Sequence, residues 1–318
     1  MTDKVYDVII IGGGPAGLAA AINAGRANLE TLLIERGVFG GNITLTSEIA
    51  NYPGCIPNES GNEFAERMTA QADSFGVTRI NAEVTEVKFL GYTRQITCGN
   101  DVYKCKIVII ATGNTLAKLG VPGEEKFTGL GVSYCAICDG PFFRGREVFV
   151  VGGGDTAVEE AIYLAKFAKK VTIIHRRDEF RAAKSIVENA EKTENIEFMF
   201  SSVVKELDGE DMLTRIVVEN VITNDTVTIE AEEGLNLGCF IFVGLIPNTN
   251  LFEGIIEMED GYIITDEEMR TSMPGIFATG DVRKKSLRQV VTATADGAVA
   301  AFEAEKIVYE LDKREEID

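Results

Sequence analysis

The chain has 318 residues, of which 45% are hydrophobic and 25% are charged, so it is long enough for two globular domains with separate cores. Its formal net charge of −19 argues against nucleic acid as a partner, because affinity for a phosphate backbone depends on basic surface. The N-terminal apolar run is one strand long and follows no basic region. We therefore expect no signal peptide, no membrane association and a cytoplasmic location.

The N-terminal segment has the pattern of a dinucleotide-binding unit. Apolar residues before Gly12 predict a buried strand, and Gly12, Gly14 and Gly17 then follow with the spacing G-x-G-x-x-G. An alanine-rich segment predicts a helix, and the second strand ends in Glu35, 18 residues beyond Gly17. In such a unit the helix N-terminus lies against a pyrophosphate, and the carboxylate accepts a hydrogen bond from a ribose hydroxyl. We therefore expect FAD or NAD to bind here.

Three alternating segments follow, and they predict a small antiparallel meander that leads into a buried strand. They span residues 82–90, 94–99 and 102–113. The last of them ends in "ATG", which we interpret as the first crossing between two domains.

Two cysteines, Cys135 and Cys138, stand three positions apart in "CAICDG", and Asp139 follows directly. A metal clip, a structural disulfide and a redox pair are the three possible interpretations. A zinc site needs four nitrogen or sulfur ligands, and the chain has one such pair and one histidine, so we predict no metal. Structural disulfides are rare in the cytosol, whereas in C-x-x-C each thiol can stabilise the reactive thiolate of its neighbour. The pattern therefore favours a redox pair.

The other four cysteines are scattered singly, and we interpret them as small buried apolar residues. Two of them, Cys98 and Cys105, flank a predicted turn, so a bridge between them stays open as an alternative. The four are Cys55, Cys98, Cys105 and Cys239.

A second fingerprint repeats the first one with a different ending. Gly152, Gly154 and Ala157 again precede a helix and a strand, but this strand leads into a cluster of basic residues. Guanidinium groups suit a 2′-phosphate, which forms bidentate, charge-assisted hydrogen bonds with them. The second unit therefore fits NADP rather than NAD. The arginines are Arg176, Arg177 and Arg181.

Alternating segments follow this unit as well, at residues 201–209, 214–222 and 226–232, and lead into an apolar stretch at 238–247. The repeat indicates an internal duplication with an offset of about 140 residues, and "GLIP" at 244–247 is the second expected crossing. No third fingerprint follows. We expect a strand to end at Gly280 and Asp281, and an amphipathic helix at residues 287–308 to follow it and direct its N-terminus at a bound cofactor.

The predicted fold is α/β, with two Rossmann-like, three-layer dinucleotide-binding domains and the NADPH domain inserted into the FAD domain. The expected boundaries are 1–114 for the first part of the FAD domain, 115–245 for the NADPH domain with the CxxC pair, and 246–318 for the second part of the FAD domain.

The chain resembles the bacterial low-molecular-weight thioredoxin reductases, a family of two-dinucleotide flavoproteins, over almost its whole length. The resemblance rests on "GGGPAG", "GGNITLTSEIANYPG", "ATG", "CAICDG", "GGGDTAVEEA", "HRRDEFRA" and "ATGDV" followed by "LRQ". It implies that FAD is bound by Gly12, Gly14, Gly17, Glu35, Gly40, Gly41, Asn42, Asn51, Thr112, Gly113, Asp281, Arg288 and Gln289. It implies that NADPH is bound by Gly152, Gly154, Asp155, Thr156, Ala157, His175, Arg176, Arg177 and Arg181.

The resemblance also implies an activity. The protein would be a cytoplasmic, homodimeric thioredoxin-disulfide reductase (NADPH), an oxidoreductase acting on a sulfur group. Electrons would pass from NADPH to FAD, to a Cys135–Cys138 disulfide and then to thioredoxin or a similar small dithiol protein, with Asp139 as the nearby acid. Because the disulfide and the NADPH site share one domain, that domain is expected to rotate about glycine hinges at Gly113 and Gly244.

Three features depart from the family pattern. Asn42 stands where the family usually has glutamine, Leu287 stands where it usually has an aromatic residue, and residues 283–285 form a basic "RKK" in an acidic chain. Alternative functions are a reductase of another small dithiol protein or low-molecular-weight disulfide, a ferredoxin- or flavodoxin-linked flavin reductase, and a flavin- or redox-sensing binding module.

Overall fold

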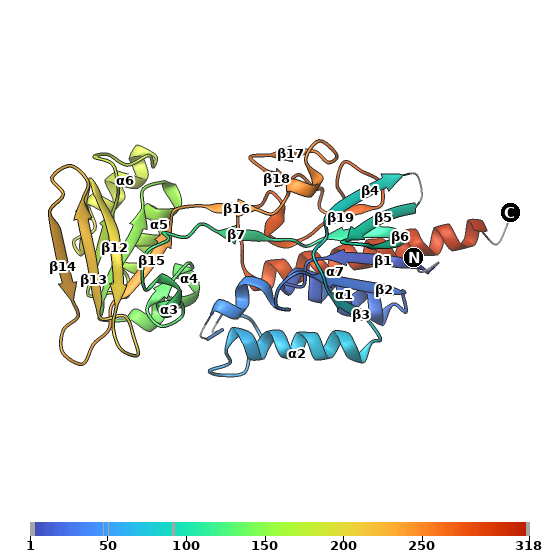
Figure 1. Cartoon of the computed structure of the whole chain (residues 1–318), viewed down its shortest axis with the longest axis horizontal. Coiled ribbons are helices and arrows are strands. Elements are labelled where there is room, and N and C mark those ends of the chain that lie inside the picture. The colour runs from blue at the N-terminus through green and yellow to red at the C-terminus, as the bar shows by residue number, and fades with distance from the viewer. Residues whose placement is uncertain (1–3, 47, 50, 91–92, 316–318) are drawn as a thin grey trace. The chain divides into compact units, whose positions relative to one another are not determined.

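The computed structural model describes residues 4–46, 48–49, 51–90 and 93–315 (Figure 1). The chain forms two compact units. Unit 1 consists of Met1–Thr44, Tyr52–Thr115 and Ile246–Asp318, and unit 2 consists of Leu45–Asn51 and Leu116–Leu245.

Unit 1 is built on a mixed sheet with the strand order β3-β2-β1-β6-β5-β4, and β19 also pairs with β6. The strands β1, β2, β3, β6 and β19 pair in parallel, whereas β4, β5 and the start of β6 form an antiparallel meander. The meander predicted from the sequence is therefore confirmed. The strands are β1 (Val5–Ile11), β2 (Thr31–Glu35), β3 (Thr78–Asn81), β4 (Glu86–Leu90), β5 (Thr93–Cys98), β6 (Asp101–Ile110) and β19 (Ile276–Ala278).

Helices α1 and α7 pack closely against one another in unit 1, and α2 also packs on α1 (Figure 1). The third fingerprint glycine permits the approach of α1 to the sheet, because a Cβ added at Gly17 would lie 1.9 Å from the carbonyl oxygen of Gly12. The remaining elements of the unit are α1 (Pro15–Arg26), η1 (Gly41–Leu45), α2 (Gly61–Ser74), η3 (Asn250–Phe252), β17 (Met258–Glu259), β18 (Tyr262–Ile263), η4 (Gly280–Val282) and α7 (Val290–Glu315).

Unit 2 contains a five-stranded parallel sheet with the order β11-β10-β9-β15-β8 and a separate antiparallel sheet with the order β12-β13-β14. The order β11-β10-β9-β15 matches β3-β2-β1-β6 of unit 1, with the fingerprint strand in the same place. The elements are α3 (Glu124–Phe127), β8 (Val132–Ser133), α4 (Ala136–Asp139), η2 (Gly140–Phe143), β9 (Glu147–Gly152), α5 (Asp155–Leu164), β10 (Lys170–Ile174), α6 (Lys184–Glu191), β11 (Ile196–Met199), β12 (Ser202–Asp208), β13 (Arg215–Asn220), β14 (Thr226–Glu230) and β15 (Gly238–Phe242).

The two segments that connect the units pair with one another. β7 (Asn114–Leu116) and β16 (Leu245–Pro247) form a two-stranded sheet. Gly113 and Gly244, which flank it, have φ values of 61° and 141°, in the region that favours glycine. Both connections therefore contain a residue with an unusual backbone conformation at the predicted hinge positions.

The predicted last helix, residues 287–308, is confirmed as α7, whereas the predicted strand end at Gly280 and Asp281 is wrong, because β19 ends at Ala278. The short 3₁₀ turn η4 follows β19 there, and α7 begins only at Val290. The intervening chain runs alongside β18 instead, because Arg283 forms a bridge with Ile263 and the N–H of Lys284 donates to the Ile263 carbonyl at 2.8 Å. The start of α7 therefore lies well beyond Asp281 in the chain.

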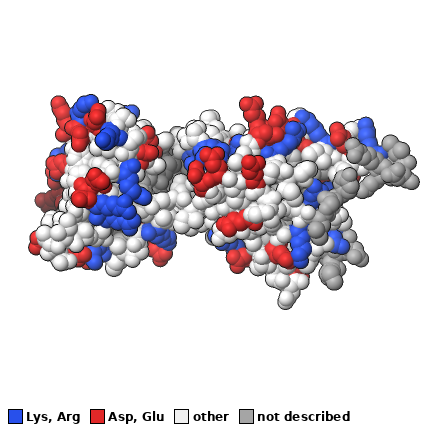
Figure 2. All heavy atoms as spheres, turned by 90° about the horizontal axis from the view of Figure 1, so that it is seen from above, with Lys and Arg blue, Asp and Glu red and all other residues white. Residues whose placement is uncertain are grey.

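Within the described residues, every helix is too short or too polar to cross a membrane. The net charge of −19 also conceals local variation: Figure 2 shows Lys and Arg side chains gathered in patches among the acidic ones on the face in view.

Candidate functional site

The first fingerprint leaves the start of α1 open. Gly14 is the N-cap of α1 and supplies no side-chain hydrogen bond, so the first N–H groups of this helix have no cap. A Cβ added at Gly14 would have Gly40 O, 3.8 Å away, as its nearest neighbour, which leaves room for a ligand at the turn. Both properties fit a bound pyrophosphate.

Glu35 lies at the end of β2, next to this turn. Its carboxylate accepts hydrogen bonds from the N–H groups of Gly13, at 2.6 Å, and Gly37, at 2.7 Å. The N–H of Gly40 donates to Gly13 O at 2.8 Å, and a Cβ added at Gly41 would lie 3.4 Å from Gly14 Cα. The structure thus brings the paired glycines and the carboxylate together around the first fingerprint, as a dinucleotide site requires.

A chain of polar side chains joins three distant parts of unit 1. Asn42 Nδ2 donates to the backbone oxygen of Asn114 at 3.0 Å and to its Oδ1 at 3.2 Å, and Asn114 Nδ2 donates to Asp281 Oδ2 at 3.5 Å. The predicted amide at position 42 is thus connected to the predicted carboxylate at 281. Asn114, which joins them, was missed from the sequence because no motif signals it.

Two buried polar atoms in this region have no hydrogen-bond partner among the described residues. They are Asp281 Oδ1 and Arg288 Nε, and the guanidinium of Arg288 lies 4.3 Å from the ring centroid of Tyr262. Burial raises the pKa of Asp281, whereas the positive charges of Lys285 and Arg288 lower it. Unsatisfied buried donors and acceptors are costly, so this pair fits a ligand that carries hydroxyl and carbonyl groups, as FAD does.

Of the other predicted FAD residues, Thr112, Gly113 and Gln289 belong to unit 1 as well. Thr112 and Gly113 follow β6, and their carbonyl oxygens accept from Asn248 at 2.9 and 3.0 Å. The N–H of Gln289 donates to Thr292 Oγ1 at 3.2 Å, just before α7. Asn51 is exposed and belongs to unit 2, whereas the rest of the set belongs to unit 1.

The second fingerprint has the same open helix start. Gly154 is the N-cap of α5 without a side-chain hydrogen bond, and a Cβ added there would meet nothing within 4 Å. Gly152 packs against Ala157, since a Cβ at Gly152 would lie 2.6 Å from the Ala157 Cβ. Asp155 and Thr156 are exposed in the first turn of α5. This turn therefore also fits a pyrophosphate.

The basic cluster lies against this turn. The N–H of Arg181 donates to Gly153 O at 2.8 Å, and a Cβ added at Gly153 would lie 2.2 Å from the His175 ring. Burial lowers the pKa of His175, a hydrogen bond to the backbone of Glu179 opposes that shift, and the charges of the nearby arginines lower the pKa further. Arg176, Arg177 and Arg181 are exposed, and no other described residue forms an ion pair or side-chain hydrogen bond with their guanidiniums. Free guanidiniums beside an open helix start fit a 2′-phosphate.

Cys135 and Cys138 form a disulfide at the start of α4. Cys135 Sγ accepts a hydrogen bond from the N–H of Cys138 at 3.2 Å, a contact that would also stabilise a thiolate on Cys135. Asp139 is buried behind the pair, where its Oδ2 accepts from Ser133 Oγ at 2.6 Å and its Oδ1 has no partner among the described residues. Burial raises the pKa of Asp139, and the Ser133 hydrogen bond opposes that shift. The sequence did not indicate Ser133 as part of this site.

The remaining thiols are free. Cys98 and Cys105 are both buried and do not form a bridge, and burial raises the pKa of Cys98 to about 11 and of Cys105 to about 12. Burial likewise raises the pKa of Cys239 to about 12. These thiols are protonated at neutral pH and therefore unreactive. Within the described residues, no group of three or more His, Cys, Asp or Glu side chains could hold a metal ion.

Known proteins match the chain over nearly its whole length. Residues 6–297 match the family described as pyridine nucleotide-disulphide oxidoreductase. A thioredoxin reductase from Peptoclostridium acidaminophilum is 51% identical over 308 residues, which cover 96% of this chain and 98% of that protein. One from Bacillus subtilis (strain 168) is 47% identical over 310 residues, which cover 97% and 96%. The crystal structure of thioredoxin reductase from Streptococcus pyogenes MGAS5005 matches with a TM-score of 0.91 at 45% identity, covering 97% and 99%.

The burial of Asp139 predicts that the difference in stability between the parent protein and an Asp139→Asn variant depends on pH. Because its pKa is raised in the folded state, the folded chain holds this proton to higher pH than the unfolded chain does, and this group costs stability as the pH rises above about 4. Asp139→Asn keeps an acceptor for Ser133 and removes the cost. We expect its urea midpoint to exceed that of the parent by a margin that grows between pH 4 and pH 7. Asp211→Asn, at an exposed position, is the control, and equal pH dependence of Asp139→Asn and the parent would contradict the prediction.

Proposed function

This chain belongs to the pyridine nucleotide-disulphide oxidoreductase family, and on that premise we propose that it is an NADPH-dependent flavoprotein that reduces the disulfide of thioredoxin or of a similar small dithiol protein. The observation that carries the proposal is the Cys135–Cys138 disulfide with the buried Asp139 behind it, in the same unit as the free arginines. A nicotinamide site and a dithiol carrier are the two ends of such a reaction.

The proposal assigns FAD to unit 1 and NADPH to unit 2. Glycines 12, 14, 17, 40 and 41 with Glu35 would hold the adenine dinucleotide part of FAD, and Asn42, Asp281 and Arg288 would contact the remainder. In unit 2 the helix start at Gly154 would hold the pyrophosphate, and the three arginines would hold the 2′-phosphate. When bound, FAD would accept a hydride from NADPH and supply two electrons to the disulfide.

The chain's own residues then perform thiol–disulfide exchange. In the reduced form, one thiolate of the Cys135–Cys138 pair attacks a sulfur of the partner's disulfide, and a mixed disulfide forms as the partner's other sulfur leaves. The second thiolate attacks the mixed disulfide, so the internal disulfide re-forms and the partner leaves as a dithiol. The reaction needs two protons, and Asp139, adjacent to Cys138, is proposed to donate one.

Both the disulfide and the arginines belong to unit 2, so each would have to reach the flavin of unit 1 in turn. We propose a rotation about the β7 and β16 connections, and the positive φ values of Gly113 and Gly244 support these hinge positions. The proposal also includes a cytoplasmic homodimer.

A ferredoxin- or flavodoxin-linked reductase is the less favoured alternative. A reductase driven by ferredoxin would not need the three arginines of an NADPH site, and a plain NADPH–ferredoxin or NADPH–flavodoxin reductase would not need Cys135 and Cys138. A reductase of a low-molecular-weight disulfide would use the same site. A comparison of the rates at which the protein reduces candidate thioredoxins and small disulfides distinguishes the two functions.

The disulfide predicts a separation of the two half-reactions. Cys135→Ser and Cys138→Ser should each abolish reduction of a protein disulfide, because a single thiol cannot resolve the mixed disulfide. Reduction of the flavin by NADPH should persist, as followed by stopped-flow absorbance. Cys55→Ser, which changes a thiol outside the pair, should keep normal turnover. Turnover of a dithiol protein at the parent rate by either pair variant would refute the proposal.

The arginine cluster predicts a preference for NADPH over NADH. Losing one charged hydrogen bond to a phosphate costs about 1.5–3 kcal/mol, which corresponds to about 10- to 150-fold in affinity. Arg176→Ala or Arg177→Ala should raise the KM for NADPH by such a factor and leave the KM for NADH unchanged. Lys192→Ala, at the far end of α6, serves as the charge control. The assignment would be wrong if the parent used both nucleotides equally.

The proton-donor role of Asp139 predicts a slower second half-reaction. Asp139→Asn should reduce the rate of disulfide turnover by at least about tenfold, within the range of general acid catalysis, and leave NADPH-to-flavin transfer largely intact. Ser133→Ala removes a hydrogen bond that lowers the pKa of Asp139, so the alkaline loss of activity should move to higher pH. Unchanged rates and pH profiles in both variants would leave Asp139 with a structural role alone.

A further inference from the structure

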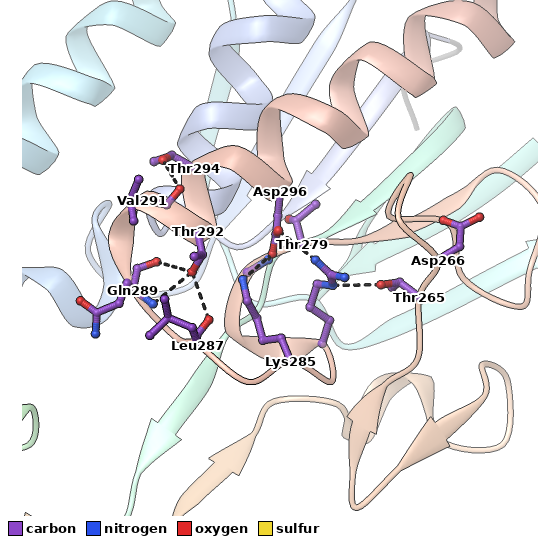
Figure 3. A network of polar contacts seen from close by, with 12 residues as sticks. Thr265, Asp266, Thr279, Lys285, Leu287, Gln289, Val291, Thr292, Thr294 and Asp296 are labelled. Carbon is purple, nitrogen blue, oxygen red and sulfur yellow. Dashed lines mark hydrogen bonds and ion pairs between the residues drawn. The ribbon is translucent and has the colours of Figure 1, made fainter. Parts of the chain in front are cut away.

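The basic "RKK" segment at 283–285 divides into one exposed and two buried cations. Lys284 is exposed and pairs with Glu259 and Asp260, each at 2.7 Å. The side chains of Arg283 and Lys285 are only 13% and 10% exposed. Both form an ion pair with one carboxylate, that of Asp296 on α7. Figure 3 shows Lys285 directed toward Asp296. We call Arg283, Lys285 and Asp296 the buried triad. The proposed reaction does not use any of these three residues.

The buried triad is tightly connected. Asp296 Oδ1 accepts from Arg283 Nη1 at 2.8 Å, and Asp296 Oδ2 accepts from Lys285 Nζ at 2.7 Å and from the N–H of Gly280 at 3.0 Å. Arg283 Nε in turn donates to Thr265 Oγ1 at 2.9 Å. Asp296 therefore holds the backbone of η4 directly and the chain after it through two cations.

The triad lies where η4, α1 and α7 meet. A Cβ added at Gly280 would lie 2.8 Å from the Ala16 Cβ, and a Cβ added at Gly297 would lie 2.2 Å from the Ala16 carbonyl oxygen. Ala16 belongs to the first turn of α1, next to the first fingerprint. The hydrogen bond to Gly280 therefore fixes the turn that carries Asp281 relative to that fingerprint.

The charges of the triad do not balance. Two buried cations face one carboxylate, and taking an unmatched charge out of water is costly unless another group compensates it. The carboxylate of Asp281 is buried close by, its Oδ1 has no partner among the described residues, and its Oδ2 has only the long contact with Asn114. Burial raises the pKa of Asp281, Lys285 and Arg288 lower it, and Asp296 raises it. The excess positive charge of the triad thus acts on Asp281 through Lys285.

We propose that Arg283, Lys285 and Asp296 are positioning residues for Asp281: Asp296 fixes the turn of Asp281 through Gly280 and holds Arg283 and Lys285 beside it, and the charge of Lys285 favours a carboxylate that can accept hydrogen bonds from FAD. The inference rests on the proposed FAD site of unit 1. A carboxylate offers acceptors to hydroxyl and N–H donors, whereas a carboxylic acid must donate one hydrogen bond itself. A triad that only fastened α7 to η4 would not affect the ionisation of Asp281.

The test is the pH dependence of FAD binding to the apoprotein, followed by the quenching of flavin fluorescence between pH 5 and pH 8. FAD binding that needs the carboxylate is lost as the pH falls through the pKa of Asp281. Lys285→Gln keeps a hydrogen-bond donor for Asp296 but removes the charge that lowers this pKa. We expect the acid midpoint of FAD binding to move to higher pH, so that the affinity of the variant relative to the parent falls as the pH is lowered. Lys285→Arg should restore both.

Two further variants make the test specific. Asp296→Asn removes the charge that raises the pKa of Asp281, so its acid midpoint should move to lower pH even if the distorted turn weakens binding overall. Lys284→Gln removes the same charge from the adjacent, exposed residue and should match the parent at every pH. Circular dichroism of each variant establishes that it is folded before the titration.

The outcomes separate this inference from the proposed function. If folded Lys285→Gln and Asp296→Asn shift the midpoint in the same direction, or if Lys285→Gln matches Lys284→Gln, the positioning role is overturned while the FAD site stands. If Lys285→Arg loses as much affinity as Lys285→Gln, shape rather than charge matters, and the inference is likewise overturned. If the parent apoprotein binds no FAD at any pH, the FAD assignment fails and the inference fails with it.

Discussion

Both units depend on the same constraint: a helix must begin directly after a central strand. No side chain caps the first N–H groups of that helix. α1 begins after Gly14 and α5 begins after Gly154, and neither N-cap residue has a side chain that could accept a hydrogen bond. The approach of α1 to the sheet leaves no room for a side chain at Gly17. Orphan donors at a helix start are stabilised by an anion, so the packing that completes each sheet also creates a site for a pyrophosphate.

The duplicated constraint explains how one fold can hold two different nucleotides. The helix start is common to both units, so the discrimination comes from the end of the next strand. In unit 1 that strand ends in Glu35, whose carboxylate faces the turn. In unit 2 the corresponding strand leads into His175 and three arginines, and the backbone of Arg181 is bonded to the turn itself. In the proposed assignment, a difference of a few residues at one strand end separates a site for a free ribose from a site for a phosphorylated one.

The sequence predicted the features that depend on local spacing. The fingerprints, their strands and helices, both meanders and the CxxC pair arise from residues close together in the chain, and the structure contains them. It did not predict contacts between distant residues, such as Asn42 with Asn114 and Asp281, because no periodicity links those positions. The path of the chain at Arg283 depends on a bridge with Ile263, and the burial of Arg283 and Lys285 depends on Asp296 in the helix that follows. Three consecutive residues of the same charge, at positions 283–285, do not indicate which side chains are buried.

Two buried aspartates show how surroundings assign opposite roles to the same side chain. Asp139 in unit 2 has one neutral donor, the Ser133 hydroxyl, and no basic residue contributes to its shifted pKa. Burial therefore dominates and favours the proton, as a group that must donate one to a thiolate requires. Asp281 in unit 1 has a buried Oδ1, and burial raises its pKa as well, but the positive charges of Lys285 and Arg288 oppose that shift. A carboxylate that must accept hydrogen bonds from a cofactor needs that opposition, and in the proposed enzyme Lys285 of the buried triad supplies it together with Arg288.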